Sequence, residues 1–149
     1  MAAGGLVRGT QGNASARAGE LIAISPSELP YEAMRPDDVC LVTPEGKLVE
    51  GPKPSVELPM HLAVLAARPD VGAVVHTHSP LATAHPPVPV AEAAPSGTPE
   101  LGAAVLVAAG AGDAVVISGH GPVCFGADLA AALRRAFELE ERARVSAGK

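Results

Sequence analysis

Short apolar runs bounded by turn-forming residues set the pattern of this chain. Aliphatic and β-branched residues dominate positions 21–24, 39–43, 73–78, 114–118 and 122–126, with Gly, Pro and Ser between the runs. Runs of this length and composition predict β-strands. The second run is followed by Pro44-Glu45-Gly46 and a short segment over 47–50, which together predict a β-hairpin.

Longer segments with apolar residues at helical spacing follow Ser55, Thr98 and Asp128, residue types that are favoured at helix N-termini. They predict helices that run from Ser55 to about Arg68, from Thr98 to about position 110, and over 129–143. A short helix is expected over 81–84. The proline-rich segment over 85–90 is expected to be extended, because consecutive prolines block helix formation.

Length and charge narrow the class of protein. At 149 residues the chain is long enough for one domain with a sizeable core, and a hydrophobic content of 48% argues against a disordered chain. The formal net charge is −5 and lysine and arginine do not cluster, which argues against a nucleic-acid partner. We expect neither a signal peptide nor a segment long enough to span a membrane.

The two cysteines, Cys40 and Cys124, lie in apolar strand-like contexts and do not form a CxxC pair. Cysteines of this kind are typical of reduced, buried thiols rather than of disulfides or metal sites. Because reduced thiols are typical of the cytoplasm, we expect a cytoplasmic protein.

Histidines lie at the ends of two of the predicted strands, and strand ends are where α/β folds present their chemistry. His76 and His78 are two residues apart, so a strand would direct both imidazoles to one face of the sheet. His120 stands between two glycines, with little bulk around it. Three imidazoles can bind a transition metal and leave an open position, as catalytic zinc requires. The alternative is one core and one surface histidine at positions 76 and 78, because histidine pairs are common.

Glu57 and His61 lie one turn apart near the start of the helix predicted after Ser55. A carboxylate in that position can complete a metal site or move a proton. Equally, it can pair with the positive end of the helix dipole. We expect His61 to be a packed core or interface histidine.

A glycine-rich segment, residues 4–12, comes before the first predicted strand, and Asn13 and Ser15 follow it with neutral donors. Such a segment can hold a phosphate or another anion without cations. It is not a Walker A loop, because no Gly-Lys-Ser/Thr follows. The alternative is an ordinary glycine turn.

Five stretches occur in an order that resembles the class II aldolase/adducin domain family, which includes L-fuculose-phosphate aldolase and L-ribulose-phosphate 4-epimerase. They are residues 5–15 (GLVRGTQGNAS), 25–27 (SPS), 53–61 (KPSVELPMH), 68–80 (RPDVGAVVHTHSP) and 119–121 (GHG). They span most of the chain, and jointly they are specific.

The resemblance implies one domain over residues 1–149 with a three-layer α/β/α fold and a largely antiparallel central sheet. It also implies a divalent metal, usually zinc but alternatively Mn²⁺ or Co²⁺, on His76, His78 and His120. Glu57 would complete the coordination sphere at rest and would act as the acid/base residue.

The same resemblance implies a substrate phosphate held by Gly12, Asn13, Ser27 and Ser55. It implies a small-molecule substrate, a place in carbohydrate metabolism, and a homotetramer with active sites between neighbouring subunits.

The activity implied by the resemblance is that of a metal-dependent lyase of the aldolase type. Such an enzyme cleaves or forms a carbon–carbon bond in a small sugar phosphate or related hydroxy-ketone, through a metal-stabilised enediolate. The alternatives are an epimerase, a dehydratase or a decarboxylase of the same fold, or a non-catalytic metal-binding or assembly domain.

The chain departs from the family pattern at several places. Glu28 stands where the family commonly has glycine, and Val56 stands where it has a second serine. A shortened form is expected, without the family's first helix before Gly5 and with part of the 83–95 segment missing. In aldolases that segment supplies a tyrosine to the neighbouring subunit's site, and Tyr31, the one tyrosine of this chain, does not match it.

Overall fold

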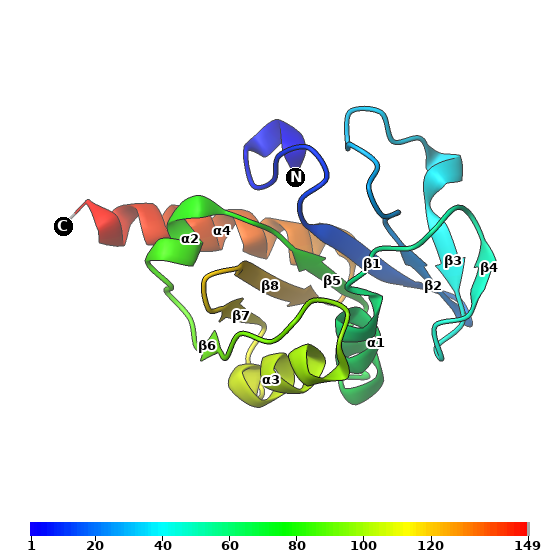
Figure 1. The fold of residues 1–149 in the computed structure, drawn as a ribbon. Coiled ribbons are helices and arrows are strands. Elements are labelled where there is room, and N and C mark those ends of the chain that lie inside the picture. The colour runs from blue at the N-terminus through cyan, green and yellow to red at the C-terminus, as the bar shows by residue number, and fades with distance from the viewer. Residues whose placement is uncertain (149) are drawn as a thin grey trace.

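One sheet of eight strands runs through the molecule, in the order β4-β3-β2-β1-β5-β8-β7-β6 (Figure 1). A computed structural model describes residues 1–148. Neighbouring strands are antiparallel except for β6 and β7, which are parallel. The strands are β1 (Asn13–Ala18), β2 (Leu21–Ile24), β3 (Cys40–Val42), β4 (Leu48–Glu50), β5 (Ala73–His76), β6 (Val90–Ala91), β7 (Ala114–Ile117) and β8 (Gly121–Gly126).

Helices cover both faces of the sheet. On one face, α1 (Leu58–Ala67) and α3 (Pro99–Ala109) pack against each other and enclose an apolar core with the sheet. On the other face, α4 (Leu129–Ala147) and α2 (Pro80–Ala84) form a second, alanine-rich core with β5 and β8 (Figure 1). Short 3₁₀ turns, η1 (Ala2–Gly4) and η2 (Pro36–Asp38), complete the elements. The predicted three-layer α/β/α fold with a largely antiparallel sheet is confirmed.

Most predicted strands are present, but β1 was not predicted. Its sequence, Asn-Ala-Ser-Ala-Arg-Ala, lacks the β-branched residues that favour strands. It nevertheless lies inside the sheet, where it pairs with β2 on one side and β5 on the other. The two-residue strand β6 lies at the end of the segment that was predicted to be extended.

Helix boundaries differ from the predictions at their caps. The helix predicted from Ser55 begins at Leu58, and the Ser55 hydroxyl instead accepts the Glu57 N–H at 3.3 Å. The Thr98 hydroxyl does not cap α3, because it donates to the Pro95 carbonyl at 2.7 Å. Asp128 caps α4 as predicted, accepting the Ala131 N–H at 2.7 Å, and α4 runs a turn beyond position 143.

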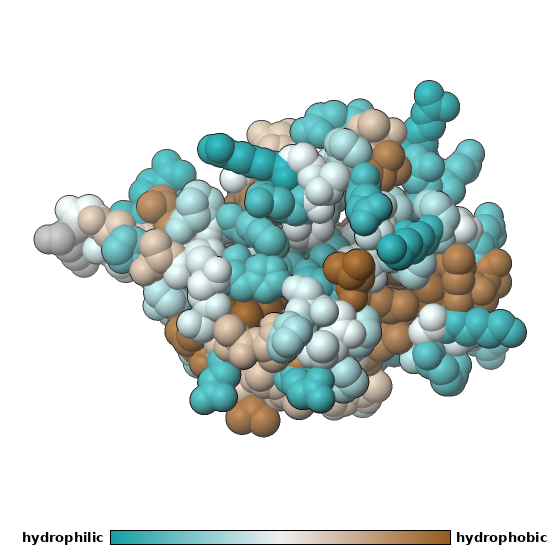
Figure 2. All heavy atoms as spheres, viewed as in Figure 1, coloured by the Kyte–Doolittle hydropathy of each residue, from teal (hydrophilic) through white to brown (hydrophobic). Residues whose placement is uncertain are grey.

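Both cysteines are buried free thiols, as predicted. Burial raises the pKa of Cys40, and it raises the pKa of Cys124 to about 12, so both thiols stay protonated. Over residues 1–148, no helix has the length and apolar composition needed to cross a bilayer. The surface has an apolar patch over β4, where Leu48 and Val49 are exposed (Figure 2).

Candidate metal centre and active site

Strand pairing brings the predicted site together at one end of the sheet. His76 is the last residue of β5 and lies opposite Asn13, the first residue of the antiparallel strand β1. On the other side of β5, β8 begins with Gly121, directly after His120. Antiparallel neighbours end and begin at the same edge, so residues far apart in the sequence meet there.

The three predicted histidines form one cluster, in which each offers a nitrogen within 4.8 Å of the others. Their ring centroids are 4.7 to 5.0 Å apart. The reason given for His76 and His78 was wrong, however. The strand ends at His76, so His78 reaches the cluster from the loop before α2 rather than by strand alternation.

The nitrogens are arranged as metal ligation requires. His76 Nδ1 donates to the Pro122 carbonyl at 2.9 Å, which leaves its Nε2 free of a hydrogen, 3.3 Å from His120 Nε2. Two zinc–nitrogen bonds of 2.0–2.1 Å at a tetrahedral angle place their nitrogens about 3.3 Å apart. Burial lowers the pKa of His76 to about 4 and also lowers the pKa of His78, so both imidazoles are neutral and able to bind a metal.

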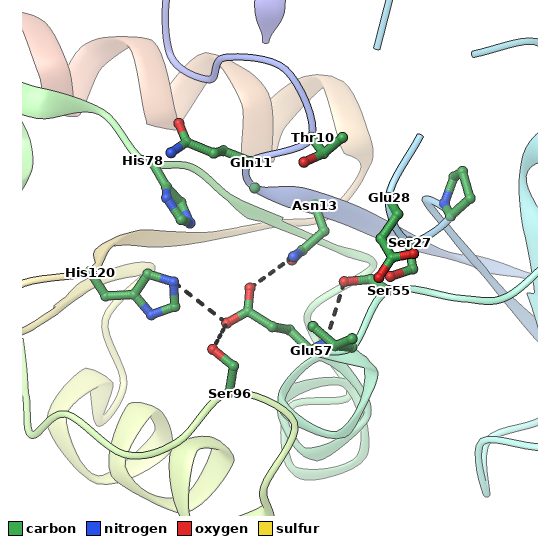
Figure 3. A pocket seen from close by; sticks show the side chains of 13 residues that line it. Thr10, Gln11, Asn13, Ser27, Glu28, Ser55, Glu57, His78, Ser96 and His120 are labelled. Atoms are coloured by element: carbon green, nitrogen blue, oxygen red, sulfur yellow. Dashed lines mark hydrogen bonds and ion pairs between the residues drawn. The ribbon is translucent and has the colours of Figure 1, made fainter. Parts of the chain in front are cut away.

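Glu57 faces this cluster from the start of α1 (Figure 3). Its Oε2 lies 3.3 Å from His76 Nε2, and its Oε1 lies 3.7 Å from His120 Nε2. Oε2 also accepts from Asn13 Nδ2 at 2.8 Å, and Oε1 accepts from the Ser96 hydroxyl at 3.1 Å. The side chain makes no capping bond to the helix, so it is directed at the site and not at the helix backbone.

The Glu57 carboxyl group is ionised in this arrangement. Burial by itself would raise its pKa, but attraction to His76 and His120 whenever these imidazoles carry a proton, and the hydrogen bonds from Asn13 and Ser96, outweigh burial and hold the pKa below its ordinary value. The site therefore holds a buried carboxylate whose partners are neutral donors and imidazoles.

A pocket of about 290 Å³ opens in front of Glu57, His78 and His120. The four residues predicted to hold a substrate phosphate all line it: Gly12, Asn13, Ser27 and Ser55. Among the described residues that line this pocket there is no lysine or arginine, so the serine, asparagine and backbone donors that it offers to an anion are neutral. His76 lies behind the pocket, fully buried.

Glu28 is the second carboxylate of the pocket lining (Figure 3). Its φ of 61° lies in the left-handed region, which costs energy for any residue other than glycine. The backbone at this position therefore keeps a glycine-like conformation although the side chain adds a negative charge.

Several residues of the site were not predicted from the sequence. Ser96 precedes α3 in a Pro-Ser-Gly-Thr turn, and only this turn signal distinguished it. Thr10 and Gln11 line the pocket from the glycine-rich segment. Tyr31 lies beside this segment, where its hydroxyl donates to the Gly12 carbonyl at 2.8 Å.

His61 lies behind Glu57, fully buried, as a packed histidine was expected to be. Burial lowers its pKa to about 3, so the imidazole is neutral. It hydrogen-bonds Asn13 and Ser15, and neither contact was predicted.

The family model described as "Class II Aldolase and Adducin N-terminal domain" matches residues 1–86 and 84–147. The chain is 38% identical over 158 aligned residues to a 5-methylthioribulose-1-phosphate/5-deoxyribulose-1-phosphate aldolase from Rhodospirillum rubrum, covering 93% of this chain and 72% of that protein. It is 48% identical over 83 residues to the L-ribulose-5-phosphate 4-epimerase UlaF of Salmonella paratyphi B, covering 54% of this chain and 36% of that protein. A solved structure of an L-fuculose 1-phosphate aldolase superposes with a TM-score of 0.89 at 30% identity, covering 94% of this chain and 76% of that one.

Proposed function

The chain belongs to the family of the class II aldolases and the adducin N-terminal domain, and from this premise we propose that it is a metal-dependent lyase of the aldolase type. Its substrate would be a small sugar phosphate, in which it cleaves or forms a carbon–carbon bond. The observation that carries the proposal is the Glu57 carboxylate, held against three clustered imidazoles at an open pocket.

His76, His78 and His120 would hold one divalent ion, and Glu57 lies close enough to complete the set at rest. The 3.3 Å between His76 Nε2 and His120 Nε2 supports this assignment, as does the Pro122 carbonyl that fixes the His76 tautomer. Zinc is the proposed ion, with Mn²⁺ and Co²⁺ as alternatives, because a cluster of imidazoles suits zinc. A bound ion would supply Lewis-acid stabilisation of negative charge on the substrate's carbonyl and hydroxyl oxygens.

Glu57 would move the proton at the carbon beside the substrate carbonyl. In the structure the hydrogen bonds from Asn13 and Ser96 favour the ionised carboxylate, and the pKa of Glu57 lies below its ordinary value. A general base that works near neutral pH needs a higher pKa than these contacts allow. We therefore infer that the substrate weakens these contacts as it enters, so that the Glu57 pKa rises toward the working pH.

Gly12, Asn13, Ser27 and Ser55 would hold the substrate phosphate. They converge on one pocket and offer backbone and side-chain donors without a cation, a type of anion site that needs no lysine or arginine. The negative charge of Glu28 would repel a bound phosphate, and replacing Glu28 measures the size of this repulsion.

A homotetramer is the proposed assembly, and the cytoplasm is the proposed location. The apolar patch on β4 supports assembly, because Leu48 and Val49 are 41% and 55% exposed on a strand at the edge of the sheet. The two free, buried thiols support a reducing compartment.

Epimerisation is the second candidate, because the 83-residue match to the UlaF epimerase reaches 48% identity, the same as an 85-residue match to a 5-deoxy-D-ribulose 1-phosphate aldolase of Bacillus thuringiensis. Both reactions would need an electrophile for the carbonyl group and a group that moves a proton. The residues described above could serve either reaction, so the two candidates are distinguished by identifying the product that the protein forms.

The test is a turnover screen with protein loaded with Zn²⁺, Mn²⁺ or Co²⁺. The substrates are 5-deoxyribulose 1-phosphate, fuculose 1-phosphate and ribulose 5-phosphate, and chelator-treated protein is the control. Cleavage to an aldehyde and a three-carbon ketone phosphate by the metal-loaded protein alone supports the lyase. Conversion of ribulose 5-phosphate to its 4-epimer would favour the second candidate, and no turnover with any ion or substrate would contradict both.

A further inference from the structure

A line of buried side chains runs from Ser15 through His61 and Asn13 to Glu57. The Ser15 hydroxyl lies 2.6 Å from His61 Nδ1, and His61 Nε2 lies 2.5 Å from Asn13 Oδ1. Asn13 Nδ2 then donates to Glu57 Oε2 at 2.8 Å. These side chains are at most 5% exposed, so loss of one partner leaves a buried polar group without its hydrogen bond.

The direction of every hydrogen bond in this line follows from Glu57. An ionised carboxylate only accepts, so Asn13 must turn its NH₂ group toward Glu57 and its carbonyl oxygen toward His61. That oxygen also only accepts, so the neutral imidazole of His61 carries its hydrogen on Nε2. His61 Nδ1 is then an acceptor, and the Ser15 hydroxyl donates to it.

His61 is also fixed by its place in the fold. It lies four residues after Glu57 on α1, on the same face and one turn further along, and its backbone N–H reaches the Glu57 carbonyl at 3.4 Å. Ser15 and Asn13 are alternate residues of β1, so they point to the same face of the sheet. The line therefore joins one strand to one helix, both rigid elements.

We propose that His61 and Ser15 are positioning residues: they lock the Asn13 amide so that its NH₂ group holds the Glu57 carboxylate at the mouth of the pocket. The claim that this matters for turnover rests on the proposed function of Glu57. An amide without this support would be free to rotate, and in the rotated orientation its oxygen would face the carboxylate and repel it.

The tautomer of His61 gives a test that does not depend on activity. In ¹⁵N-histidine-labelled, zinc-loaded protein, long-range ¹H–¹⁵N spectra should show His61 with a hydrogen on Nε2 and none on Nδ1. His61→Gln identifies the signal by its loss. A hydrogen on Nδ1 would overturn the proposal, because Asn13 would then have to present its oxygen to Glu57.

Three variants separate positioning from packing. His61→Leu removes both hydrogen bonds, whereas His61→Gln keeps an N–H donor that can reach Asn13. Val64→Ala is the control, since Val64 is buried on the same helix and its aliphatic side chain makes no hydrogen bond to the line. We expect His61→Leu to keep its metal and its KM within about twofold and to lose kcat by about tenfold or more. His61→Gln should recover most of that loss, and Val64→Ala should lower the melting temperature without lowering kcat. Equal kcat losses in His61→Leu and Val64→Ala, or no recovery in His61→Gln, would overturn the proposal.

Two further measurements cover failure of folding and failure of the proposed function. If His61→Leu does not fold, Ser15→Ala replaces it. A loss of kcat at unchanged KM and metal content is again expected, and an unchanged kcat would contradict the positioning role of the line.

If the wild-type protein turns over no substrate, only the proposed function fails, and the Asn13 side-chain NH₂ signals decide the positioning claim. They should lose protection from solvent exchange in His61→Leu and keep it in His61→Gln, and equal protection in both variants would overturn the claim.

Discussion

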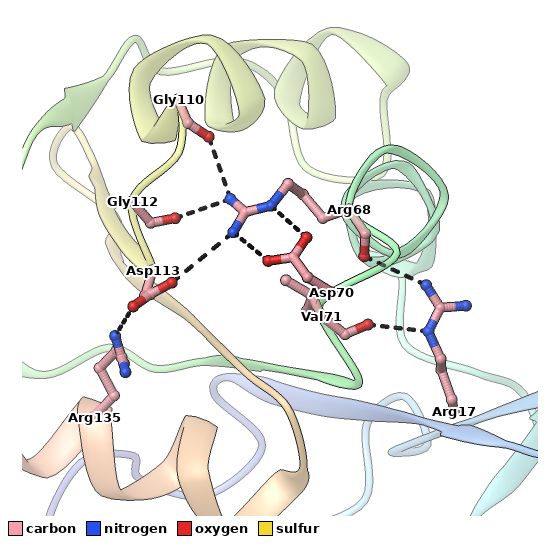
Figure 4. Close-up of polar contacts among 8 residues, drawn as sticks. All are labelled: Arg17, Arg68, Asp70, Val71, Gly110, Gly112, Asp113 and Arg135. Atoms are coloured by element: carbon pink, nitrogen blue, oxygen red, sulfur yellow. Dashed lines mark hydrogen bonds and ion pairs between the residues drawn. The ribbon is translucent and has the colours of Figure 1, made fainter.

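The two ends of α1 carry two polar networks that differ in how their charge is balanced. At the N-terminal end, Glu57 is buried among neutral donors and imidazoles, and one side of its carboxylate remains open to the pocket. At the C-terminal end, Arg68 binds both oxygens of Asp70 and donates to the carbonyls of Gly110 and Gly112 (Figure 4).

The Arg68 network holds elements together. Its guanidinium group joins the end of α1 to the turn after α3, and Asp113 in that turn pairs with Arg135 of α4 (Figure 4). Arg17 of β1 adds hydrogen bonds to the carbonyls of Leu65 and Val71.

The comparison separates two uses of a charged side chain. Arg68 has partners on its Nε and on both Nη atoms, so its charge stabilises the contacts between these elements. Glu57 lacks a lysine or arginine partner among the described residues and sits beside atoms that can bind a metal, an arrangement that favours chemistry over stability. Changes at the N-terminal end of α1 should therefore affect turnover, and changes at the C-terminal end should affect stability.

The largest effect is expected for Glu57→Gln. This change keeps the size of the side chain and removes the group that moves a proton, so kcat should fall by about 100-fold or more. Metal content and melting temperature should stay close to those of the wild-type protein. All three are measured on one preparation, with Glu100→Gln in the first turn of α3 as the control. An unchanged kcat with a lower melting temperature would show that the carboxylate serves the helix instead.

Arg68→Ala should act in the opposite way. Loss of the bidentate pair and of two carbonyl contacts should lower the free energy of unfolding by about 1–3 kcal/mol, while kcat stays unchanged. Urea unfolding measures the first quantity and steady-state kinetics the second. Arg134→Ala, at an exposed position on α4, is the control for loss of a positive charge. A fall in kcat comparable to that of Glu57→Gln would remove the distinction between the two ends.

Glu28→Gly should strengthen binding of a phosphorylated substrate. Removing a negative charge from the pocket should lower KM by roughly three- to tenfold, the effect of about 1 kcal/mol of repulsion at partly solvated distances. Glu28→Gln separates the causes, because it removes the charge but keeps a side chain at the left-handed position. A KM that rises in both variants would mean that Glu28 helps to bind the substrate.

The smallest effect is expected from Asp70→Asn. The hydrogen bond from Arg68 lowers the pKa of Asp70 below its ordinary value of 3.8. The carboxylate therefore stabilises the fold fully above that value, and this contribution is lost as the pH falls through the lower pKa of the folded state. Denaturation midpoints of Asp70→Asn and wild type should differ at neutral pH and converge in acid. Glu20→Gln, in the exposed β1–β2 turn, is the control, and a difference that grows as the pH falls would contradict the assignment.

Most of the sheet could be predicted because its strands carry their own signal. The segments 73–76 and 114–117 are fully buried and consist almost entirely of apolar residues, so composition alone indicated strands. In β1, polar residues alternate with alanine and nothing local favours a strand. That strand is stabilised by its two neighbours, which are distant in the sequence.

The same division applies to the site. Residues whose type reveals their chemistry, such as His76, His120 and Glu57, could be predicted from the sequence. Ser96 and Ser15 could not, because their roles depend on partners 39 and 46 positions away. A serine near a turn or strand carries no local sign of such a contact.

The claim on which the account depends is that His76, His78 and His120 bind one metal ion beside Glu57. Elemental analysis of purified protein and of His78→Ala, after exhaustive dialysis, tests it most directly. We expect close to one divalent ion per wild-type chain and none in a folded His78→Ala variant. One tightly bound ion per chain in that variant would contradict it.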